Sequence, residues 1–239
     1  MSKIEFVDHS TVTLYKSNAY DVDCARAAWV SQNTQAHETE AEAGRAERLI
    51  NFLLREKHMS PFENGSFTFI IDTPIFVARE FMRHRSFAYS EVSGRYTELE
   101  PRFYVPSLDR PMRQEGKVGN YTFVPDGELS IDHVIPHIEA NSRDSWNSYQ
   151  ALLEYGVAKE VARMVLPVNT MTTFWATVNP RNLMHFLDLR TDAQAMFEIR
   201  EVAVKMEEIF KQQMPLTYKA CRKTNRTRRS TSEPEGQRR

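Results

Sequence analysis

Strictly alternating apolar residues are the feature that most constrains this chain, because they predict strands that are buried on one face only. In the segment SFTFIID, Phe67, Phe69 and Ile71 recur at every second position, which is the period at which the side chains of a strand reach the same face. The segment TMTTFWATV, residues 170–178, is strand-like in a similar way. Near the start of the chain, IEFVD and TVTLYKS predict a pair of strands that lie against each other.

Helical periodicity occupies much of the remaining chain. Asn179 followed by Pro180 predicts a helix start, because Asn caps helices and Pro favours the first helical position. Thr73 predicts another helix start and Asp192 a third. The predicted helices cover residues 21–31, 44–58, 73–85, 131–156, 157–166, 180–189 and a last helix after Asp192. Because helices and strands do not alternate regularly, the pattern favours an α+β fold over a doubly wound sheet. Residues 100–129, with little periodicity, predict an irregular excursion over the surface.

The formal net charge of −1 conceals an uneven distribution of charge. From Lys219 to Arg239 the chain carries eight Lys or Arg and two Glu, so the body that precedes this segment is net negative. A polar, basic run predicts a disordered tail, which divides the chain into a domain over residues 1–218 and a tail over residues 219–239. The negative body argues against general binding of nucleic acid.

Length, hydropathy and cysteine content bound the class of protein. The 239 residues and the hydrophobic content of 41% suit a soluble protein with a substantial core. The start MSKIEFVDHS has no apolar stretch typical of a signal peptide, and no run of apolar residues is long enough to predict a membrane span. Cys24 and Cys221 lie far apart and form no metal-type or redox motif, which predicts a reducing cytoplasm without disulfides.

The sequence gives little support to three other kinds of functional site: a glycine-rich nucleotide loop, a metal site and a nucleophilic cysteine. The eight glycines form neither G-x-G-x-x-G nor a P-loop, which excludes these two modes of nucleotide binding. His133 and His137 have the spacing of two metal ligands on one helix face, but Pro136 lies between them and no third ligand is near. We therefore predict a solvated helix face and no metal. Cys24 stands among alanines on an apolar helix, which indicates a small buried side chain rather than a nucleophile.

Cationic side chains concentrate in and just before the segment RHRSFAYSEVSGRY, residues 83–96. Within 17 positions the chain holds Arg79, Arg83, His84, Arg85 and Arg95. A guanidinium group is a natural bidentate partner for phosphate oxygens. Further arginines border apolar helical faces, namely Arg163, Arg181 and Arg190. An arginine at such a border is often paired with a carboxylate or extends along the apolar surface to water, so each one alone leaves a structural role open. Together they favour a site for an anion.

The stretch from Arg83 to Ser93 resembles the hallmark of the flavin-dependent thymidylate synthases, which is Arg-His-Arg, seven residues and then Ser. Further segments are similar to the family's other motifs and stand in its order. These are AAWVS (27–31), HMSPFE (58–63), FYVPS (103–107), EVARMVLP (160–167) and TVNPRNLMHFLDLR (177–190). The resemblance covers about residues 4–218 and leaves only the basic tail outside.

This resemblance implies a single domain in which a mixed sheet is flanked by long helices. It implies a homotetramer whose sites lie between subunits, with small molecules as partners and with neither nucleic acid nor membrane. The implied enzyme converts dUMP to dTMP, with FAD as cofactor, 5,10-methylenetetrahydrofolate as carbon donor and NADPH as reductant. The hydride chemistry then belongs to the flavin, and the protein positions the reactants.

The resemblance also assigns site residues by position. It matches dUMP contacts to Glu80, Arg83, Glu91, Ser93, Gly94, Arg95, Arg163 and Arg190. It matches FAD contacts to Ser31, His58, Ser60, Glu63, Arg83, His84, Arg85, Glu91, Asn179, Arg181 and His185. The predicted catalytic residue is Arg190, since its guanidinium would stabilise the negative charge that the uracil ring gains when N3 ionises. The phosphate of dUMP suits Arg95, Arg163 and the backbone amides of the turn at Ser93.

Two positions depart from the family's pattern. Many members have Gln where this chain has Glu80. A carboxylate there could repel the phosphate, or it could pair with Arg83 or His84, which follow three and four residues later. Position 185 is His where some relatives have Asn, and both side chains can hydrogen bond to a cofactor.

Two other functions stay open on the sequence alone. A nucleic-acid-binding protein would use the basic tail and the arginines. A flavin-binding relative without methylation would only oxidise NADPH. Arg163 and Arg190 favour the synthase over the oxidase, because neither is needed to hold a flavin.

Overall fold

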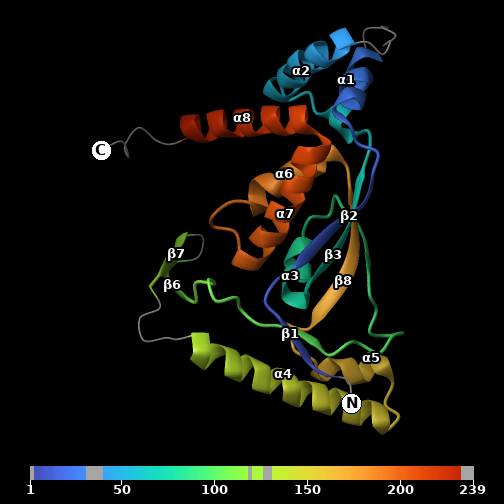
Figure 1. Cartoon of the computed structure of the whole chain (residues 1–239), viewed down its shortest axis with the longest axis vertical. Coiled ribbons are helices and arrows are strands. Elements are labelled where there is room, and N and C mark those ends of the chain that lie inside the picture. The colour runs from blue at the N-terminus through green and yellow to red at the C-terminus, as the bar shows by residue number, and fades with distance from the viewer. Residues whose placement is uncertain (1–2, 31–39, 118–119, 126–130, 233–239) are drawn as a thin grey trace.

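Figure 1 shows the chain as a computed structural model, which describes residues 3–30, 40–117, 120–125 and 131–232. The strands are β1 (Glu5–Val7), β2 (Thr11–Ser17), β3 (Phe67–Pro74), β4 (Ala88–Glu91), β5 (Arg102–Tyr104), β6 (Arg113–Lys117), β7 (Asn120–Val124) and β8 (Met171–Val178). The helices are α1 (Asp21–Val30), α2 (Glu40–Arg55), α3 (Ile75–Phe81), α4 (Ile131–Glu154), α5 (Lys159–Ala162), α6 (Pro180–Arg190), α7 (Phe197–Gln213) and α8 (Pro215–Ser232), with two 3-10 turns, η1 (Ser60–Glu63) and η2 (Arg163–Val165). The predicted α+β class is confirmed.

Four strands form the central sheet in the order β2–β3–β8–β4, and every neighbouring pair is antiparallel. The longest ladder joins β3 to β8 over eight residue pairs. The predicted alternation in β3 is confirmed, since Phe67, Phe69 and Ile71 are fully buried. The two long apolar strands therefore occupy the centre of the sheet, and the short β4 lies at its edge. Parallel pairing occurs outside this sheet, between β1 and β5.

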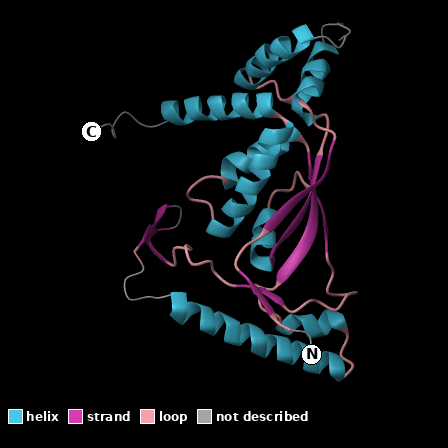
Figure 2. Cartoon of the chain, viewed as in Figure 1, coloured by secondary structure: helices cyan, strands magenta, loops and turns pink. Residues whose placement is uncertain are grey.

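The helices α3, α6 and α7 lie against one face of the sheet (Figures 1 and 2). On this face the ring of Phe81 lies 5.3 Å from that of Phe174 and 4.6 Å from that of Phe186. The alternate residue Trp175 belongs to the opposite face, where its ring lies 4.3 Å from that of Tyr15. Trp175 is 40% exposed and Tyr15 is 55% exposed. The second face of the sheet thus carries aromatic side chains that the described helices leave open.

The predicted pairing of the first two strands is wrong. β1 pairs in parallel with β5, with Phe6 opposite Phe103, whereas β2 pairs with β3. Ahead of β2, the buried hydroxyls of Ser10 and Thr73 hydrogen bond over 2.8 Å, which ties the start of β2 to the end of β3. Strand pairing here depends on contacts between distant segments, and the local alternation does not contain that information.

One of the three predicted helix starts is confirmed. In α6, Asn179 Oδ1 accepts a hydrogen bond from the backbone N–H of Asn182 over 2.9 Å. Thr73 instead belongs to β3, where its hydroxyl is used by the contact just described. Asp192 forms a turn in which its carboxylate accepts from a backbone N–H two residues later over 3.0 Å, and α7 starts only after that turn. A side chain whose hydrogen bond is already used, in a strand contact or in a turn, cannot also cap the start of a helix.

Residues 100–129 are less irregular than predicted, since they contain three short strands, β5, β6 and β7. Phe103 of β5 is fully buried. It packs with Trp146 and Tyr149 of α4, with its ring centroid 6.3 Å from that of Trp146. This second apolar cluster fixes the long helix α4, which continues through Pro136, to the body of the protein.

The predicted boundary between domain and tail falls inside a helix. α8 continues to Ser232 and packs against α2 and α7. Ala220 is 2% exposed, and Cys221 packs against the main core. Residues 219–232 contain no Gly or Pro and several Lys and Arg, which favour helix, so the backbone does not become disordered at residue 219. Residues 233–239 lie outside the described residues.

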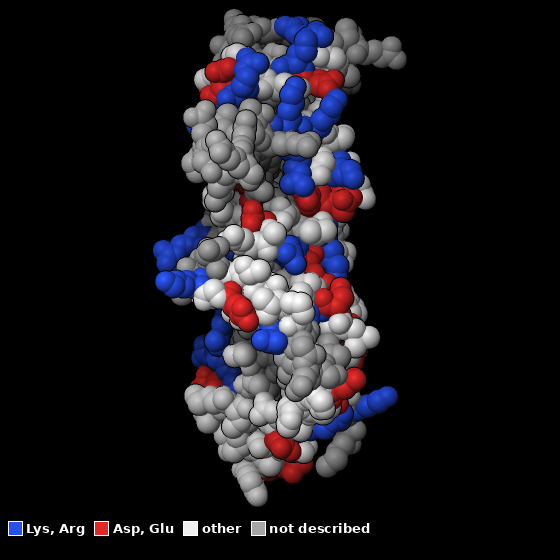
Figure 3. All heavy atoms as spheres, turned by 90° about the vertical axis from the view of Figure 1, so that its left-hand side faces the viewer, with Lys and Arg blue, Asp and Glu red and all other residues white. Residues whose placement is uncertain are grey.

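Charged side chains of both signs cover the face shown in Figure 3. Lys and Arg are most numerous toward the end of the molecule that holds α2 and α8 in Figure 1, and acidic side chains lie among them. Within the described ranges, no helix has both the length and the apolar composition needed to cross a bilayer.

Candidate functional site

The Arg-His-Arg segment forms a tight turn between α3 and β4. The backbone N–H of His84 donates to the carbonyl of Phe81 over 3.1 Å. The hydroxyl of Tyr89 donates to the carbonyls of Phe81 and His84 over 3.2 and 2.8 Å, and burial raises the pKa of Tyr89 so that it stays protonated. Arg83 and Arg85 are exposed, and His84 is half-buried. The turn therefore presents two guanidinium groups from a fixed backbone.

Beside this turn, His84 and Glu80 both contact Arg190, the last residue of α6. The Nε–H of Arg190 donates to His84 Nε2 over 2.9 Å, and its Nη1 forms an ion pair with Glu80. The pKa of His84 is lowered to about 4, mainly by burial and then by the charges of Arg190 and His185. His84 is therefore neutral at neutral pH, and its Nε2 can accept the hydrogen bond from Arg190.

Of the two alternatives open for Glu80, pairing with Arg83 or His84 is not what the structure shows. α3 ends at Phe81, so these residues do not share a helix face, and the carboxylate contacts Arg190 instead. A guanidinium has five N–H donors, and the two contacts to His84 and Glu80 leave about three of them for other partners. The Arg190 side chain is 21% exposed. The result is a fixed guanidinium whose remaining donors lie at a partly open position.

A second group of predicted residues follows β4. The backbone N–H of Arg95 donates to Ser93 Oγ over 3.3 Å, and Arg95 Nε donates to Glu160 over 3.0 Å. Gly94 is buried, and a Cβ added there would lie 3.2 Å from Cδ of Arg163. Only glycine permits this close approach without a shift. It brings the exposed guanidinium of Arg163 beside the turn at Ser93.

The extended segment that contains β4 separates these two groups of arginines. At about 3.3 Å per residue, the distance from Ala88 to Ser93 is about 17 Å. Arg190 contacts His84, which precedes this segment, whereas Arg163 lies beside the turn that follows it. Within one chain, the residues matched to dUMP are therefore divided between the two ends of β4.

A cavity of about 580 Å³ lies beside the first turns of α6. Arg181 and His185, both matched to FAD, line this cavity. Glu63, also matched to FAD, forms an ion pair with Arg181. The other lining residues come from α2, α6, α8 and the segment after α2, and they are Leu54, Lys57, Met59, Asn182, Met184, Asp188, Cys221 and Thr224. The cavity combines cationic and polar groups with an apolar wall.

The other residues matched to FAD, as far as the structure describes them, do not line this cavity. His58 is exposed and stacks on a phenylalanine ring of α2, with 6.0 Å between the ring centroids. Ser60 is exposed at the start of η1, and Asn179 is used as the N-cap of α6. Glu91 accepts a hydrogen bond from a threonine of β8 over 2.8 Å. Ser31 lies outside the described residues.

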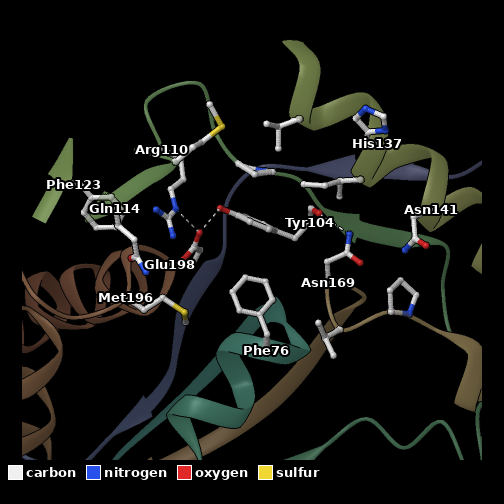
Figure 4. A pocket seen from close by; sticks show the side chains of 16 residues that line it. Phe76, Tyr104, Arg110, Gln114, Phe123, His137, Asn141, Asn169, Met196 and Glu198 are labelled. Carbon is white, nitrogen blue, oxygen red and sulfur yellow. Dashed lines mark hydrogen bonds and ion pairs between the residues drawn. The ribbon is translucent and has the colours of Figure 1, made fainter. Parts of the chain in front are cut away.

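A larger cavity of about 820 Å³ is lined by none of the predicted site residues. Figure 4 shows it among α4, the start of α3 and the segment that carries Arg110. Arg110 Nε donates to the buried Glu198 over 2.9 Å, and Tyr104 donates to the same carboxylate over 3.4 Å. The guanidinium also lies 5.3 Å from the ring centroid of Phe123. Arg110 and Tyr104 thus both contact Oε1 of Glu198, whereas its Oε2 is buried without a hydrogen-bond partner among the described residues.

The two cysteines differ in their distance from the predicted site. Cys24 is buried in α1, and burial raises its pKa to about 12, as expected for a small core side chain. Cys221 was expected in a disordered end, but it lies on α8 at the cavity beside α6. Among the described residues, no group of three His, Cys, Asp or Glu side chains is arranged to hold a metal ion. His133 and His137 are exposed on α4.

Two residues that contribute to these sites, Tyr89 and Lys57, are not among the residues predicted from the sequence. Tyr89 holds the turn of His84 through its hydroxyl, and Lys57 lines the cavity beside α6. The spacing of Tyr89 carries no signal of such a contact. Lys57 carries no such signal either, because it lies inside the helix predicted over residues 44–58, whereas α2 ends at Arg55 in the structure.

An α+β protein with two groups of arginines, one beside the Arg-His-Arg turn and one beside the turn at Ser93, is the class that this fold and these residues define. The chain belongs to the family of thymidylate synthase complementing proteins, which matches residues 13–216.

Relatives of known name resemble this chain over nearly its whole length. The flavin-dependent thymidylate synthase of Streptomyces avermitilis is 45% identical over 228 residues, which cover 91% of this chain and 93% of that protein. The enzyme of the same name from Thermotoga neapolitana is 42% identical over 219 residues, with the same coverage of 91% and 93%. The crystal structure of the UMP/dUMP methylase PolB from Streptomyces cacaoi, bound with 5-Br UMP, superimposes with a TM-score of 0.84 at 38% identity and covers 93% of this chain and 98% of that chain.

Proposed function

We propose that this chain is a flavin-dependent thymidylate synthase that methylates dUMP to dTMP. The observation that carries this proposal is the position of α6, which brings Arg181 and His185 to a cavity and Arg190 to the Arg-His-Arg turn. A cofactor in the cavity and a nucleotide at Arg190 would then lie along the same helix. The names of the two thymidylate synthases and of PolB support the same class of reaction.

The residues around the cavity beside α6 fit FAD. A volume of about 580 Å³ lies within the usual range for ligand pockets. Arg181 and His185 suit a pyrophosphate, and the thioethers of Met59 and Met184 suit a planar ring. FAD supplies the redox chemistry when bound, with NADPH as reductant and 5,10-methylenetetrahydrofolate as carbon donor.

Arg190 is the proposed catalytic residue. His84 and Glu80 hold its guanidinium in one orientation, so its remaining N–H donors are preorganised for charge that develops on the uracil ring. When N3 loses its proton, these donors would stabilise the negative charge, and C5 becomes more electron-rich. Activation of this kind needs no thiol on C6, in agreement with the burial and raised pKa of Cys24.

The phosphate of dUMP would bind at the second group of residues. Arg95 and Arg163 provide cations there, and the turn at Ser93 provides backbone amides. Because this group and Arg190 lie at opposite ends of β4, we propose that two copies of the chain complete each dUMP site. The exposed Tyr15 and Trp175 on the open face of the sheet support contact between copies, and we propose a homotetramer.

We also propose a cytoplasmic location. Cys24 and Cys221 are both free of disulfides, which suits a reducing compartment.

The function is tested by tritium release from dUMP labelled at C5, with FAD, NADPH and 5,10-methylenetetrahydrofolate present, and with labelled UMP assayed in parallel. We expect release from dUMP that requires the folate. Arg190→Ala should retain bound flavin but slow methylation in a single turnover by about 30- to 1000-fold, the loss of one charged hydrogen bond in the transition state. Consumption of NADPH without tritium release would favour the oxidase instead, and a colourless protein that binds nucleic acid would contradict both enzymes.

A further inference from the structure

α2 is followed by a residue whose backbone conformation favours glycine. Lys57 has a φ of 61°, the only positive φ of a residue other than glycine among the described residues. The backbone N–H of His58 donates to the carbonyl of Leu53 over 2.8 Å, and that of Lys57 donates to the carbonyl of Leu54 over 3.4 Å. This pattern is a Schellman motif, whose left-handed position is usually glycine. A side chain at this position carries a conformational cost. A lysine here therefore suggests that the side chain has a role that glycine could not fill.

The cavity beside α6 provides such a role. Lys57 lines this cavity together with Arg181 and His185. Arg181 already pairs with Glu63, whereas Lys57 is exposed and forms no ion pair with another described residue. Asp188 is the one carboxylate among the residues that line the cavity. Because Arg181 is paired with Glu63, Lys57 is the cation of this lining that remains available to an anionic ligand.

We propose that Lys57 is a further ligand-binding residue of this cavity, and that its ammonium group contacts the pyrophosphate of FAD. The inference rests on the proposed function, which places FAD in the cavity. A compact ammonium on a flexible stem binds phosphate oxygens as a point charge. The apolar wall of Leu54, Met59 and Met184 remains available to the rings of the cofactor.

The alternative is a purely structural role, in which Lys57 only occupies the left-handed position after α2. The two interpretations differ in what glycine would do at this position. If Lys57 only ends α2, Lys57→Gly relieves the backbone and leaves binding of FAD unchanged. If Lys57 contacts the pyrophosphate, the same change stabilises the protein without ligand and weakens binding of FAD. Opposite effects on stability and binding are therefore the signature of a binding residue at a strained position.

The experiment uses the full chain stripped of flavin and compares Lys57→Gly, Lys57→Arg and Lys211→Gln with the wild type. Lys211→Gln is the control for loss of one positive charge, since Lys211 pairs with Glu208 on the exposed part of α7. Thermal unfolding gives the Tm without ligand, and quenching of flavin fluorescence gives the Kd for FAD at low and high salt.

We expect Lys57→Gly to raise the Tm without ligand by about 1–3 °C, because the left-handed strain is removed. It should weaken FAD binding about tenfold through loss of one charge-assisted contact, and it should reduce the salt dependence of the Kd. Lys57→Arg should keep the Kd within about threefold of the wild type, because the positive charge remains. Lys211→Gln should change neither quantity.

An FAD affinity of Lys57→Gly within about twofold of the wild type would overturn the inference, and so would an equal loss in Lys211→Gln. The proposed function can fail separately. A wild type that releases no tritium from dUMP, while Lys57→Gly still weakens FAD binding, contradicts the synthase and supports the role of Lys57. A wild type that makes dTMP, while Lys57→Gly binds FAD normally, contradicts only the role of Lys57.

Discussion

Arg190 receives its orientation from two neighbours that differ in charge. His84 is neutral and only accepts a hydrogen bond, whereas Glu80 forms an ion pair with the same guanidinium. The carboxylate therefore does two things at once: it fixes Arg190, and it offsets part of the positive charge that an ionised uracil ring would meet. These two effects oppose each other in catalysis, and a substitution that separates them tests the arrangement.

Glu80→Gln should separate them, because the amide oxygen still accepts a hydrogen bond from Arg190 while the negative charge is lost. We expect dUMP to bind about three- to tenfold more tightly to this variant, with a single-turnover rate at least equal to that of the wild type. Glu80→Ala removes the anchor as well and should slow the single turnover about tenfold. Calorimetric titration with dUMP and a rapid-quench assay measure the two quantities.

Glu208→Gln is the matched control for net charge, because Glu208 lies on α7 in an exposed pair with Lys211. It should leave both quantities unchanged. Equal loss of rate in Glu80→Gln and Glu80→Ala would show that the carboxylate itself is required, which contradicts the separation argued above.

His84 links the same cluster to the pH dependence of stability. Its pKa is lowered from the ordinary value of 6.5 to about 4 in the folded chain. Between these pH values the unfolded chain binds a proton at this position that the folded chain does not, so His84 makes stability fall as the pH falls from about 6.5 to about 4. We expect His84→Gln to lose less stability than the wild type over this range, as measured by Tm at both pH values. His133→Gln, which alters an exposed histidine of α4, should follow the wild type.

At the scale of elements, helix α6 was the most predictable part of the site. Its start at Asn179 and Pro180 and its apolar face follow from local sequence, whereas the predicted end at Leu189 falls one residue short of Arg190. The partners of its side chains do not follow from local sequence, because Glu80 and Glu63 come from segments more than 100 residues away in the chain. The family resemblance matched most of the site residues by position, but it could not show that Arg190 and Arg163 lie at opposite ends of β4.

Helix α8 is the element that local composition predicted least well. Its basic residues suggested a disordered tail, yet Arg222 pairs with Glu207 over 3.3 Å, and the Glu207 side chain is only 11% exposed. Burial raises the pKa of Glu207, and the charge of Arg222 opposes that shift. Amphipathic contacts of this kind are set by the neighbours of the helix and are invisible in a count of charges.

Truncation tests whether α8 belongs to the domain. A chain that ends at Tyr218 loses the buried Ala220 and leaves Glu207 without its cation. We expect this chain to lose roughly 1–3 kcal/mol of stability, or roughly 2–12 °C in Tm, and to bind FAD more weakly because Cys221 and Thr224 line the cavity. A chain that ends at Ser232 should match the full chain in thermal unfolding and flavin titration. If the chain ending at Tyr218 were equally stable, the predicted boundary at residue 218 would be correct after all.

At the scale of the whole molecule, the sheet has helices on one face (Figure 2). Its other face carries the exposed side chains of Tyr15 and Trp175. Edge strand β4 separates the residues matched to the phosphate of dUMP from Arg190, by about 17 Å of extended chain. In the proposed function, one chain would thus hold two halves of a dUMP site at opposite ends of β4. A symmetric assembly solves this problem, because the first half of one copy can meet the second half of its neighbour.

Mixing two inactive variants tests this arrangement of halves directly. Arg163→Ala damages the half that follows β4, and Arg190→Ala damages the half that precedes it, so each variant alone should be strongly impaired. If each site combines Arg163 of one copy with Arg190 of another, random hybrid tetramers formed by co-expression should contain intact sites. Because each of the two contributing copies is the required variant half of the time, about one quarter of the sites should be intact, and tritium release should recover to about one quarter of the wild-type rate. Homotetramers of each single variant provide the baseline rate of tritium release. Size-exclusion chromatography checks that these and the hybrids assemble to the same size. If instead one copy supplies both arginines, every site carries a substitution, and the hybrids will be no more active than the parent variants.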